Sequence, residues 1–270
     1  MQERQTDTVN RTAWHDGRWP RALFTAVQFL SRLPVPGGAH RDLSTFPDDI
    51  RRGLVFFPLI GCCIGAITAA VLLAASHLVA WPVAVLIALA AEAAVTGAFH
   101  EDAVADFCDA FGGGWTREDT FRILKDSRIG SFGALGLGLA VAMRAAALIA
   151  MADVWHAAFV LVAAGGIARA VTLIVMAAVP PVSGRDSLSK DIGQEATWRT
   201  VVAGTLLIFP VLCLVLWRDP VGCLGMGIAL VVFVIWLRRL LLRRLGGATG
   251  DCLGFAAYGG LLAATIGLGR

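Results

Sequence analysis

"WHAAFVLVAAGGIARAVTLIVMAAV", residues 155–179, decides the class of fold. Apart from Arg169, this stretch contains no Asp, Glu, Lys or Arg. About 20 consecutive apolar residues are enough for a helix to cross the hydrocarbon core of a bilayer. The whole chain is 57% hydrophobic and 16% charged, whereas a soluble domain is roughly 45–50% apolar and 25% charged. The sequence therefore predicts a polytopic membrane protein.

Further apolar blocks have the length and composition of membrane helices. They are residues 54–80, 82–99, 133–152, 200–216, 221–237 and 254–269. The last block is short and glycine-rich, which leaves open whether it crosses fully. Residues 20–36 are shorter, and Arg21 and Arg32 flank their apolar run, as is typical of a helix lying at the membrane interface. We expect an all-α bundle of about seven transmembrane helices with an interfacial N-terminal helix.

Basic residues gather on one side of these alternating spans. Of the 23 Lys and Arg residues, 19 lie in four segments: 1–53, 100–132, 180–199 and 238–253. Cytoplasmic loops of membrane proteins carry an excess of Lys and Arg. We therefore expect a protein of the cell inner membrane with its N-terminus and three large polar loops in the cytoplasm.

The stretch "FHEDAVADFCDAFGGGW", residues 99–115, places carboxylates at the edge of an apolar block. Asp102, Asp106 and Asp109 have the spacing i, i+4, i+7, so they fall within about 60° of one another on a helix. Glu101 lies on the adjoining flank. Like charges on one face repel unless a cation lies between them, and oxygen ligands favour Mg²⁺, Mn²⁺ or Ca²⁺. We predict that these four carboxylates hold a divalent cation. The alternative is a solvated acidic face.

Glycines and basic residues follow the acidic stretch. Gly112 and Gly113 let the backbone bend and approach a ligand closely. In "ILKDSRIGSFG", Lys125 and Arg128 supply positive charge, and Ser127 can hydrogen-bond to phosphate oxygens. A metal ion on one side and Arg or Lys on the other neutralise the oxygens of a phosphoryl group while a hydroxyl attacks it. Ordinary basic residues beside a membrane are the alternative interpretation.

A second polar segment, "GGATGD" at 246–251, precedes the last apolar block. Asp251 is a candidate metal ligand or general base, and equally a candidate helix cap that accepts backbone N–H bonds. Gly247 and Gly250 would let backbone amides cradle a phosphate. This segment is therefore a second candidate part of the same site.

Two arginines lie inside apolar blocks, where a charge is costly and indicates a function by default. Arg169 follows Gly165 and Gly166 by one turn, and we expect it to line a cavity. For Arg144, pairing with a carboxylate such as Glu92 is as good an interpretation as a functional role. Together, these residues predict a membrane-embedded, Mg²⁺-dependent transferase acting on a phosphate ester or pyrophosphate.

Five ordered blocks resemble the cobalamin synthase family, also called adenosylcobinamide-GDP ribazoletransferases. They are "AVQFLSRLPVP" (26–36), "FFPLIGCCIGAI" (56–67), "FHEDAVADFCDAFGGG" with "ILKDSRIGSFGALGL" (99–137), "ARAVTLIVMAAVPPV" (168–182) and "GGATGDCLGFA" (246–256). The chain departs from the family at Ala103 and Ala110, where members often have glycine after the aspartate. Because the carboxylates themselves are retained, the resemblance implies an active enzyme.

The resemblance implies a reaction of adenosylcobinamide-GDP with α-ribazole, or its 5′-phosphate. The products are adenosylcobalamin, or its 5′-phosphate, and GMP. Mg²⁺ on the aspartates would bind the pyrophosphate, and Lys125 and Arg128 would stabilise charge on the phosphoryl oxygens and on GMP. Asp106 or Asp251 would accept the proton of the attacking ribose hydroxyl.

The domain and partner expectations follow from the same resemblance. We expect one transferase domain over residues 1–270, with residues 100–132 as its cytoplasmic catalytic loop. The bilayer and the two small molecules are the expected partners; we expect no nucleic acid, and the sequence does not indicate an oligomeric state. Two alternative functions are a CDP-alcohol phosphatidyltransferase and, more remotely, a cation transporter with an acidic gate.

Overall fold

The computed structural model describes residues 18–35, 46–151, 153–182 and 196–269. Residues 1–17 and most of the predicted cytoplasmic loop 180–199 lie outside these ranges. Within them the chain is helical, and the only β-type pairing is an isolated bridge between Pro181 and Ala248. The predicted all-α fold is confirmed.

Five continuous helices are long and apolar enough to cross a membrane. The first runs over Phe46–Ser76 and comprises α2 (Phe46–Gly53), a 3₁₀ turn (Leu54–Phe56) and α3 (Phe57–Ser76); the others are α7 (Ser131–Ile149), α8 (Val154–Ala178), α12 (Pro220–Arg244) and α13 (Gly250–Leu268).

Two further pairs of helices are long and apolar enough to cross a membrane only when the two helices of each pair are taken together. They are α4 (Trp81–Thr96) with α5 (Phe99–Gly113), bent by 89°, and α10 (Trp198–Leu207) with α11 (Phe209–Arg218), bent by 66°. Counting each pair as one span gives seven, the number that the sequence predicts, although α5 lies in the segment predicted to be a cytoplasmic loop. The remaining helices are α1 (Arg18–Leu30) and α6 (Arg117–Ile123).

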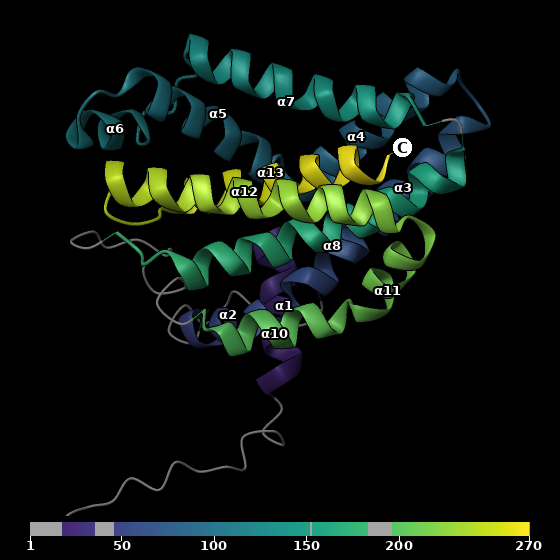
Figure 1. The fold of residues 1–270 in the computed structure, drawn as a ribbon, viewed down its shortest axis with the longest axis horizontal. Helices are drawn as coiled ribbons and strands as arrows, with labels where there is room; N and C mark the ends of the chain where they lie inside the picture. Colours follow the sequence, from purple (N-terminus) through teal and green to yellow (C-terminus); the bar gives the residue numbers. More distant parts are fainter. Residues whose placement is uncertain (1–17, 36–45, 152, 183–195, 270) are drawn as a thin grey trace, which may run out of the picture.

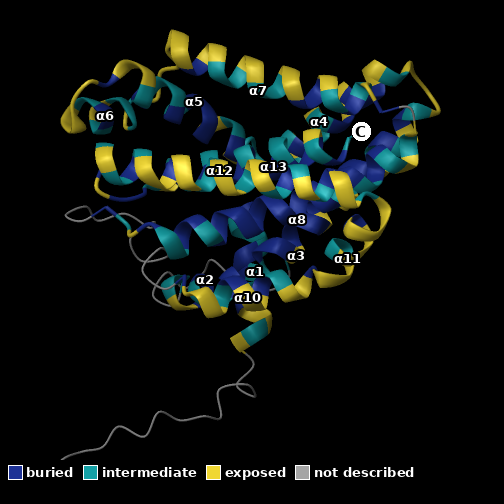
Figure 2. Cartoon of the chain, viewed as in Figure 1, coloured by how far each residue is buried: buried dark blue, intermediate teal, exposed yellow. Residues whose placement is uncertain are grey.

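Helix α8 lies at the centre of the bundle, between α3 and α13 (Figure 1). Figure 2 shows it dark blue along most of its length, whereas α7 and α12 are largely yellow. In the most apolar part of each helix, 83% of the residues are buried in α8 but only 22% in α7 and 17% in α12. Since the exposed residues of α7 and α12 include many large apolar side chains, these two helices present the lipid-facing surface of the bundle.

The block 200–216, expected to be one span, is instead two helices. The break falls at Ile208, because Pro210 occupies the first turn of α11. Proline has no N–H to donate, and its ring clashes with the carbonyl four residues earlier, so a straight helix cannot pass through it. The last apolar block, 254–269, by contrast forms a longer helix than the sequence indicates. α13 is a complete helix of 19 residues that passes the span test by itself.

The acidic stretch forms its own helix, α5, rather than a continuation of α4. The turn between them uses two left-handed residues, Gly97 (φ 70°) and Ala98 (φ 56°). A methyl group on Gly97 would overlap the guanidinium of Arg32, whose backbone N–H donates to Val95 O at 2.8 Å. The turn therefore sets the direction of α5 and is held by the segment after α1.

We predict that Gly97→Ala destabilises the fold and that Ala98→Gly does not. An alanine at Gly97 adds about 1–2 kcal/mol of left-handed strain and a clash with Arg32. At position 98 the native alanine already carries that strain, so glycine relieves it. Thermal unfolding of the detergent-solubilised protein measures both variants. Equal melting temperatures for Gly97→Ala and the unmodified chain would contradict this account of the turn.

Candidate active site

Helices α5 and α13 approach closely at Ala103 and Gly254. A methyl group on Gly254 would overlap the Ala103 side chain, so the crossing depends on the glycine. Asp251 lies in the first turn of α13, and this crossing brings it near Asp102 and Asp106 of α5. Three predicted site residues from two distant segments therefore meet.

The three aspartates carry negative charge that no nearby cation neutralises. Asp102 is exposed, and Asp106 and Asp251 are half-buried. Within the described ranges, no Lys or Arg forms an ion pair with any of them. α5 is not one of the five continuous spans. Burial, together with the charges of Asp102, Asp251 and Asp109, raises the pKa of Asp106 to about 6. A cation would stabilise this arrangement.

The donor atoms fit Mg²⁺ shared with a substrate, not a cage made by protein alone. In the part of the chain that the structure describes, no three His, Cys, Asp or Glu side chains gather closely enough to hold a metal ion. Mg²⁺ is commonly bound by one or two carboxylates, with phosphate oxygens and water completing its shell. A set of three open carboxylates is compatible with that mode.

Asp109, the third acid of the spacing, has a different environment. Its Oδ2 accepts the Gly130 N–H at 2.7 Å, and its Oδ1 accepts the Gly133 N–H at 2.8 Å. α7 begins at Ser131, and the residue before it, Gly130, has no capping side chain. Asp109 therefore supplies the N-terminal cap of α7 from another helix. Sequence reasoning missed this role, for which the glycines on either side of Ser131 are the only local signal.

Glu101 is directed inward rather than toward the other acids. It is half-buried, and its Oε2 is buried without a hydrogen-bond partner. The structure thus divides the four predicted ligands: Asp102 and Asp106 share a region with Asp251, Asp109 caps α7, and Glu101 lies in the interior.

The predicted basic residues lie in the exposed turn between α6 and α7. Lys125, Ser127 and Arg128 are exposed. Arg128 is bound to Asp126 by two contacts, Nε to Oδ1 at 2.9 Å and Nη2 to Oδ2 at 2.6 Å. Hydrogen bonds from Arg128 lower the pKa of Asp126 to about 2. Sequence reasoning did not single out Asp126.

A cleft of about 440 Å³ joins this turn to the end of α5. Its lining includes Asp109, Gly113, Asp126, Arg128 and Ser131. Of the predicted acids and basic residues, the cleft therefore brings Asp109 and Arg128 together. Gly112 faces α7 instead, since a methyl group there would lie 2.7 Å from the Phe132 ring.

The glycine-rich loop before α13 is fixed by backbone pairing. Ala248 N–H donates to Pro180 O at 2.9 Å, and Val182 N–H donates to Ala248 O at 3.2 Å. Gly247 is buried here, and a methyl group on it would lie 2.7 Å from Pro180 O. Close packing therefore explains this glycine. The side chain of Thr249 caps α13, so the interpretation of Asp251 as the helix cap is wrong.

Arg169 lines a cavity of about 220 Å³, as predicted. The arginine is 2% exposed. Among the residues that the structure describes, its Nη1 makes one long contact, 3.5 Å, to Gly165 O, and its Nε has no hydrogen-bond partner. The other lining residues are mostly apolar and aromatic and come from α1, α3, α5, α8 and α13: Phe29, Leu30, Phe57, Phe99, His100, Thr172, Met176, Gly250, Leu253, Gly254 and Ala257. Because Gly250 directly precedes Asp251, the cavity reaches the start of α13 beside that aspartate.

The second intramembrane arginine has a structural partner. Arg144 Nη1 and Nη2 donate to Glu92 Oε1 and Oε2 at 2.9 and 2.8 Å, and Thr68 Oγ1 donates to Oε2 at 3.0 Å. Arg144 and Glu92 are both buried. This confirms the predicted pair. Breaking it would leave an uncompensated buried charge between α4 and α7.

Comparisons with known proteins agree with this arrangement. The family model described as cobalamin-5-phosphate synthase matches residues 22–268. The adenosylcobinamide-GDP ribazoletransferase of Ralstonia pickettii is 37% identical over 244 residues, covering 87% of this chain and 90% of its own. That of Shewanella frigidimarina is 38% identical over 251 residues, covering 88% and 91%.

Solved structures give no further comparison, because none matches significantly. The family model covers most of the chain, and the relatives are similar across nearly their whole length. The helical membrane architecture and the five sequence blocks lie within the matched region. The chain therefore belongs to the cobalamin-5-phosphate synthase family.

Proposed function

We propose that the chain joins adenosylcobinamide-GDP to α-ribazole, or to its 5′-phosphate, and releases GMP. The observation that supports this proposal is the proximity of Asp106 to Asp102 and Asp251, with Gly250, the residue before Asp251, in the lining of the Arg169 cavity. The names of the relatives supply the substrates. We place the reaction at the end of the bundle that carries most of the basic residues. We also place this end in the cytoplasm and the spans in the cell inner membrane.

The reaction is a phosphoryl transfer. A ribose hydroxyl oxygen forms a bond to the phosphorus attached to cobinamide, and the bond from that phosphorus to the bridging pyrophosphate oxygen breaks. GMP leaves with that oxygen, and the hydroxyl proton passes to a carboxylate. We assign this proton to Asp106, whose pKa of about 6 lies near the range of an effective general base.

One or two of the carboxylates of Asp102, Asp106 and Asp251 would hold Mg²⁺ together with oxygens of the pyrophosphate. The ion would neutralise negative charge on the phosphoryl oxygens. Lys125 and Arg128 would supply the opposing positive charge, with Ser127 as a hydrogen-bond donor. Since Arg128 is bound to Asp126 in the structure, an incoming phosphate would have to compete for the guanidinium.

The Arg169 cavity fits the base of the ribazole substrate. Benzimidazole is flat and apolar, with one unsubstituted ring nitrogen that accepts a hydrogen bond. The cavity offers the aromatic rings of Phe29, Phe57 and Phe99 and the side chain of Arg169, whose guanidinium is incompletely paired among the described residues. A phosphate, by contrast, needs several donors, because its burial is costly unless its oxygens are all paired.

We predict that Asp106→Asn lowers GMP release by at least about 100-fold, the usual scale for losing an acid–base group. The measurement is GMP formation from adenosylcobinamide-GDP and α-ribazole by purified protein in detergent. Asp119→Asn is the matched control, because Asp119 is a half-buried acid of the neighbouring α6 and pairs with Arg122. Near-normal turnover by Asp106→Asn would overturn the site. Turnover of CDP-diacylglycerol by the unmodified protein would favour the phosphatidyltransferase alternative.

We predict that protons compete with Mg²⁺ at the aspartates. Below a pH of about 6, Asp106 is increasingly protonated, so the Mg²⁺ concentration for half-maximal activity should rise as the pH falls and level off above about pH 7. Chelation by EDTA should stop GMP release, and added Mg²⁺ should restore it. The test is an Mg²⁺ titration at several pH values. A half-maximal concentration independent of pH between 5 and 7 would contradict the competition.

We predict that Arg169→Met raises the KM for α-ribazole roughly 10- to 100-fold, the scale of one hydrogen bond from a charged donor. The KM for adenosylcobinamide-GDP should change little. Removing an incompletely paired buried charge should not lower the melting temperature, so folding is a usable control. Equal increases in both KM values would exclude a base-binding role for this cavity.

A further inference from the structure

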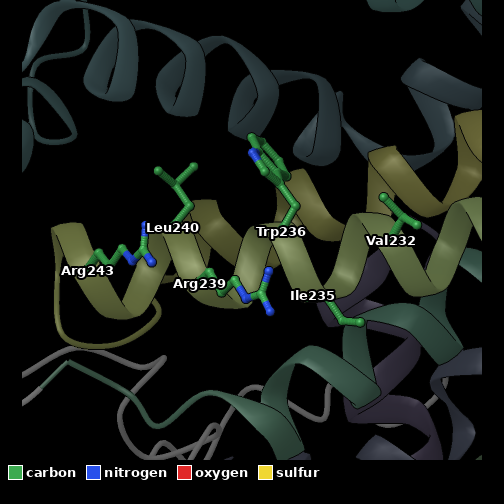
Figure 3. Close-up of a pocket in the computed structure, with 6 residues that line it drawn as sticks. All are labelled: Val232, Ile235, Trp236, Arg239, Leu240 and Arg243. Carbon is green, nitrogen blue, oxygen red and sulfur yellow. The ribbon is translucent and has the colours of Figure 1, made fainter.

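The lipid-facing side of α12 carries a groove that the transfer reaction does not use. The groove has a volume of about 410 Å³, and its lining residues all come from α12 (Figure 3). Their spacing follows one helix face. They are Val232, Ile235, Trp236, Arg239, Leu240 and Arg243. Four of the six lining residues are apolar, and the two arginines lie toward the Arg243 end.

The four arginines near the end of α12 divide into two pairs. Arg238 donates to Ala178 O at 3.2 Å, and Arg244 donates to Gly114 O and lies over the Phe111 ring. These two hold α12 to its neighbours. Arg239 and Arg243 are exposed and make no ion pair or hydrogen bond with any residue in the described ranges.

Figure 3 shows Arg239 and Arg243 extended along α12, with Leu240, Trp236 and Val232 projecting on one side of them and Ile235 on the other. Trp236 lies one turn before them, and tryptophan favours the level of the lipid headgroups. Val232 and Ile235 continue the groove toward the membrane centre, and both are exposed. The face thus presents two positive charges one helical turn apart and an apolar track that continues from them toward the membrane centre.

We propose that this groove binds an anionic phospholipid. The headgroup phosphate would lie between Arg239 and Arg243, and an acyl chain would lie along Trp236, Ile235 and Val232. Arginine clusters at the cytoplasmic end of a membrane helix attract anionic headgroups. The track beneath them suits a hydrocarbon chain, which a soluble phosphate ester lacks.

A second copy of the chain fits this face less well. In a symmetric membrane dimer the twofold axis is perpendicular to the membrane, so an α12–α12 interface would be parallel and would oppose identical residues. Arg239 and Arg243 of each copy would then face the same two arginines of the other. Such like charges repel, and their burial would be costly.

The test measures which lipid contacts Trp236. The full chain is reconstituted into bilayers of phosphatidylcholine that contain brominated phosphatidylglycerol or, separately, brominated phosphatidylcholine. Bromine quenches nearby tryptophan fluorescence, and subtracting the signal of Trp236→Phe isolates Trp236 from the other tryptophans. We expect a preference for phosphatidylglycerol on the order of thirtyfold, which corresponds to about 1 kcal/mol for each of the two arginines. Arg239→Gln with Arg243→Gln should reduce it to about one.

Two matched controls separate charge from folding. Arg239→Lys with Arg243→Lys should keep a clear preference, and Arg199→Gln, an exposed arginine on α10, should not alter it. A preference of about one in the unmodified protein would overturn the proposal, as would an unchanged preference in the double glutamine variant. Crosslinking between copies through Ile235→Cys would show a dimer interface instead. The readout is lipid contact, so its outcome is independent of the proposed transfer reaction.

Discussion

The contact between α3 and α8 is the constraint on which the rest of the structure depends. Methyl groups on Gly61 and Gly165 would overlap the opposing backbone, so these helices can meet only because both positions lack a side chain. The same approach brings the Gly61 position against the side chain of Arg169. In lipid, helix association relies on such close backbone packing, because the hydrophobic effect does not distinguish lipid from apolar side chains. The walls of the Arg169 cavity follow from this contact.

From that contact the geometry extends to the aspartates. α13 packs on the other side of α8, and its first turn carries Asp251. Gly254 then lets α13 meet α5 at Ala103. The two helices thus hold their carboxylates near one another despite mutual repulsion. The arrangement is stable as part of a packed bundle, and it leaves a negative site that a cation or proton can occupy. Asp109 contributes differently, since its hydrogen bonds fix the start of α7 and hence the turn that carries Arg128.

Local patterns predicted the helical spans but not the turns that direct them. Apolar length alone indicates residues 155–179, and the helix observed is Val154–Ala178. Pro210 was available in the sequence as the cause of the α10–α11 break. Gly97 and Ala98 gave no such signal, because small residues are common inside membrane helices; the left-handed turn depends on the neighbouring Arg32.

The candidate site shows the same limit. The i, i+4, i+7 spacing correctly places three aspartates on one helix, and a carboxylate partner for Arg144 was predictable. Spacing does not show that Asp109 would find the N–H groups of Gly130 and Gly133 on another helix, or that Thr249 would cap α13. The role of Asp126 was also not predictable, because it depends on the local fold of an exposed turn. Tertiary contacts decide which of several similar acids remains free.

The length of α4 gives the 89° turn a further consequence. α4 has 16 residues, so it rises about 24 Å, whereas the hydrocarbon core of a bilayer is about 30 Å thick. The chain turns into α5 before a helix of that length can clear the core, and a short hydrophobic stretch is matched by local thinning of the bilayer. The aspartates would then lie in a depression of the membrane surface. Membrane thickness would become a physical variable that acts on the site without touching any of its residues.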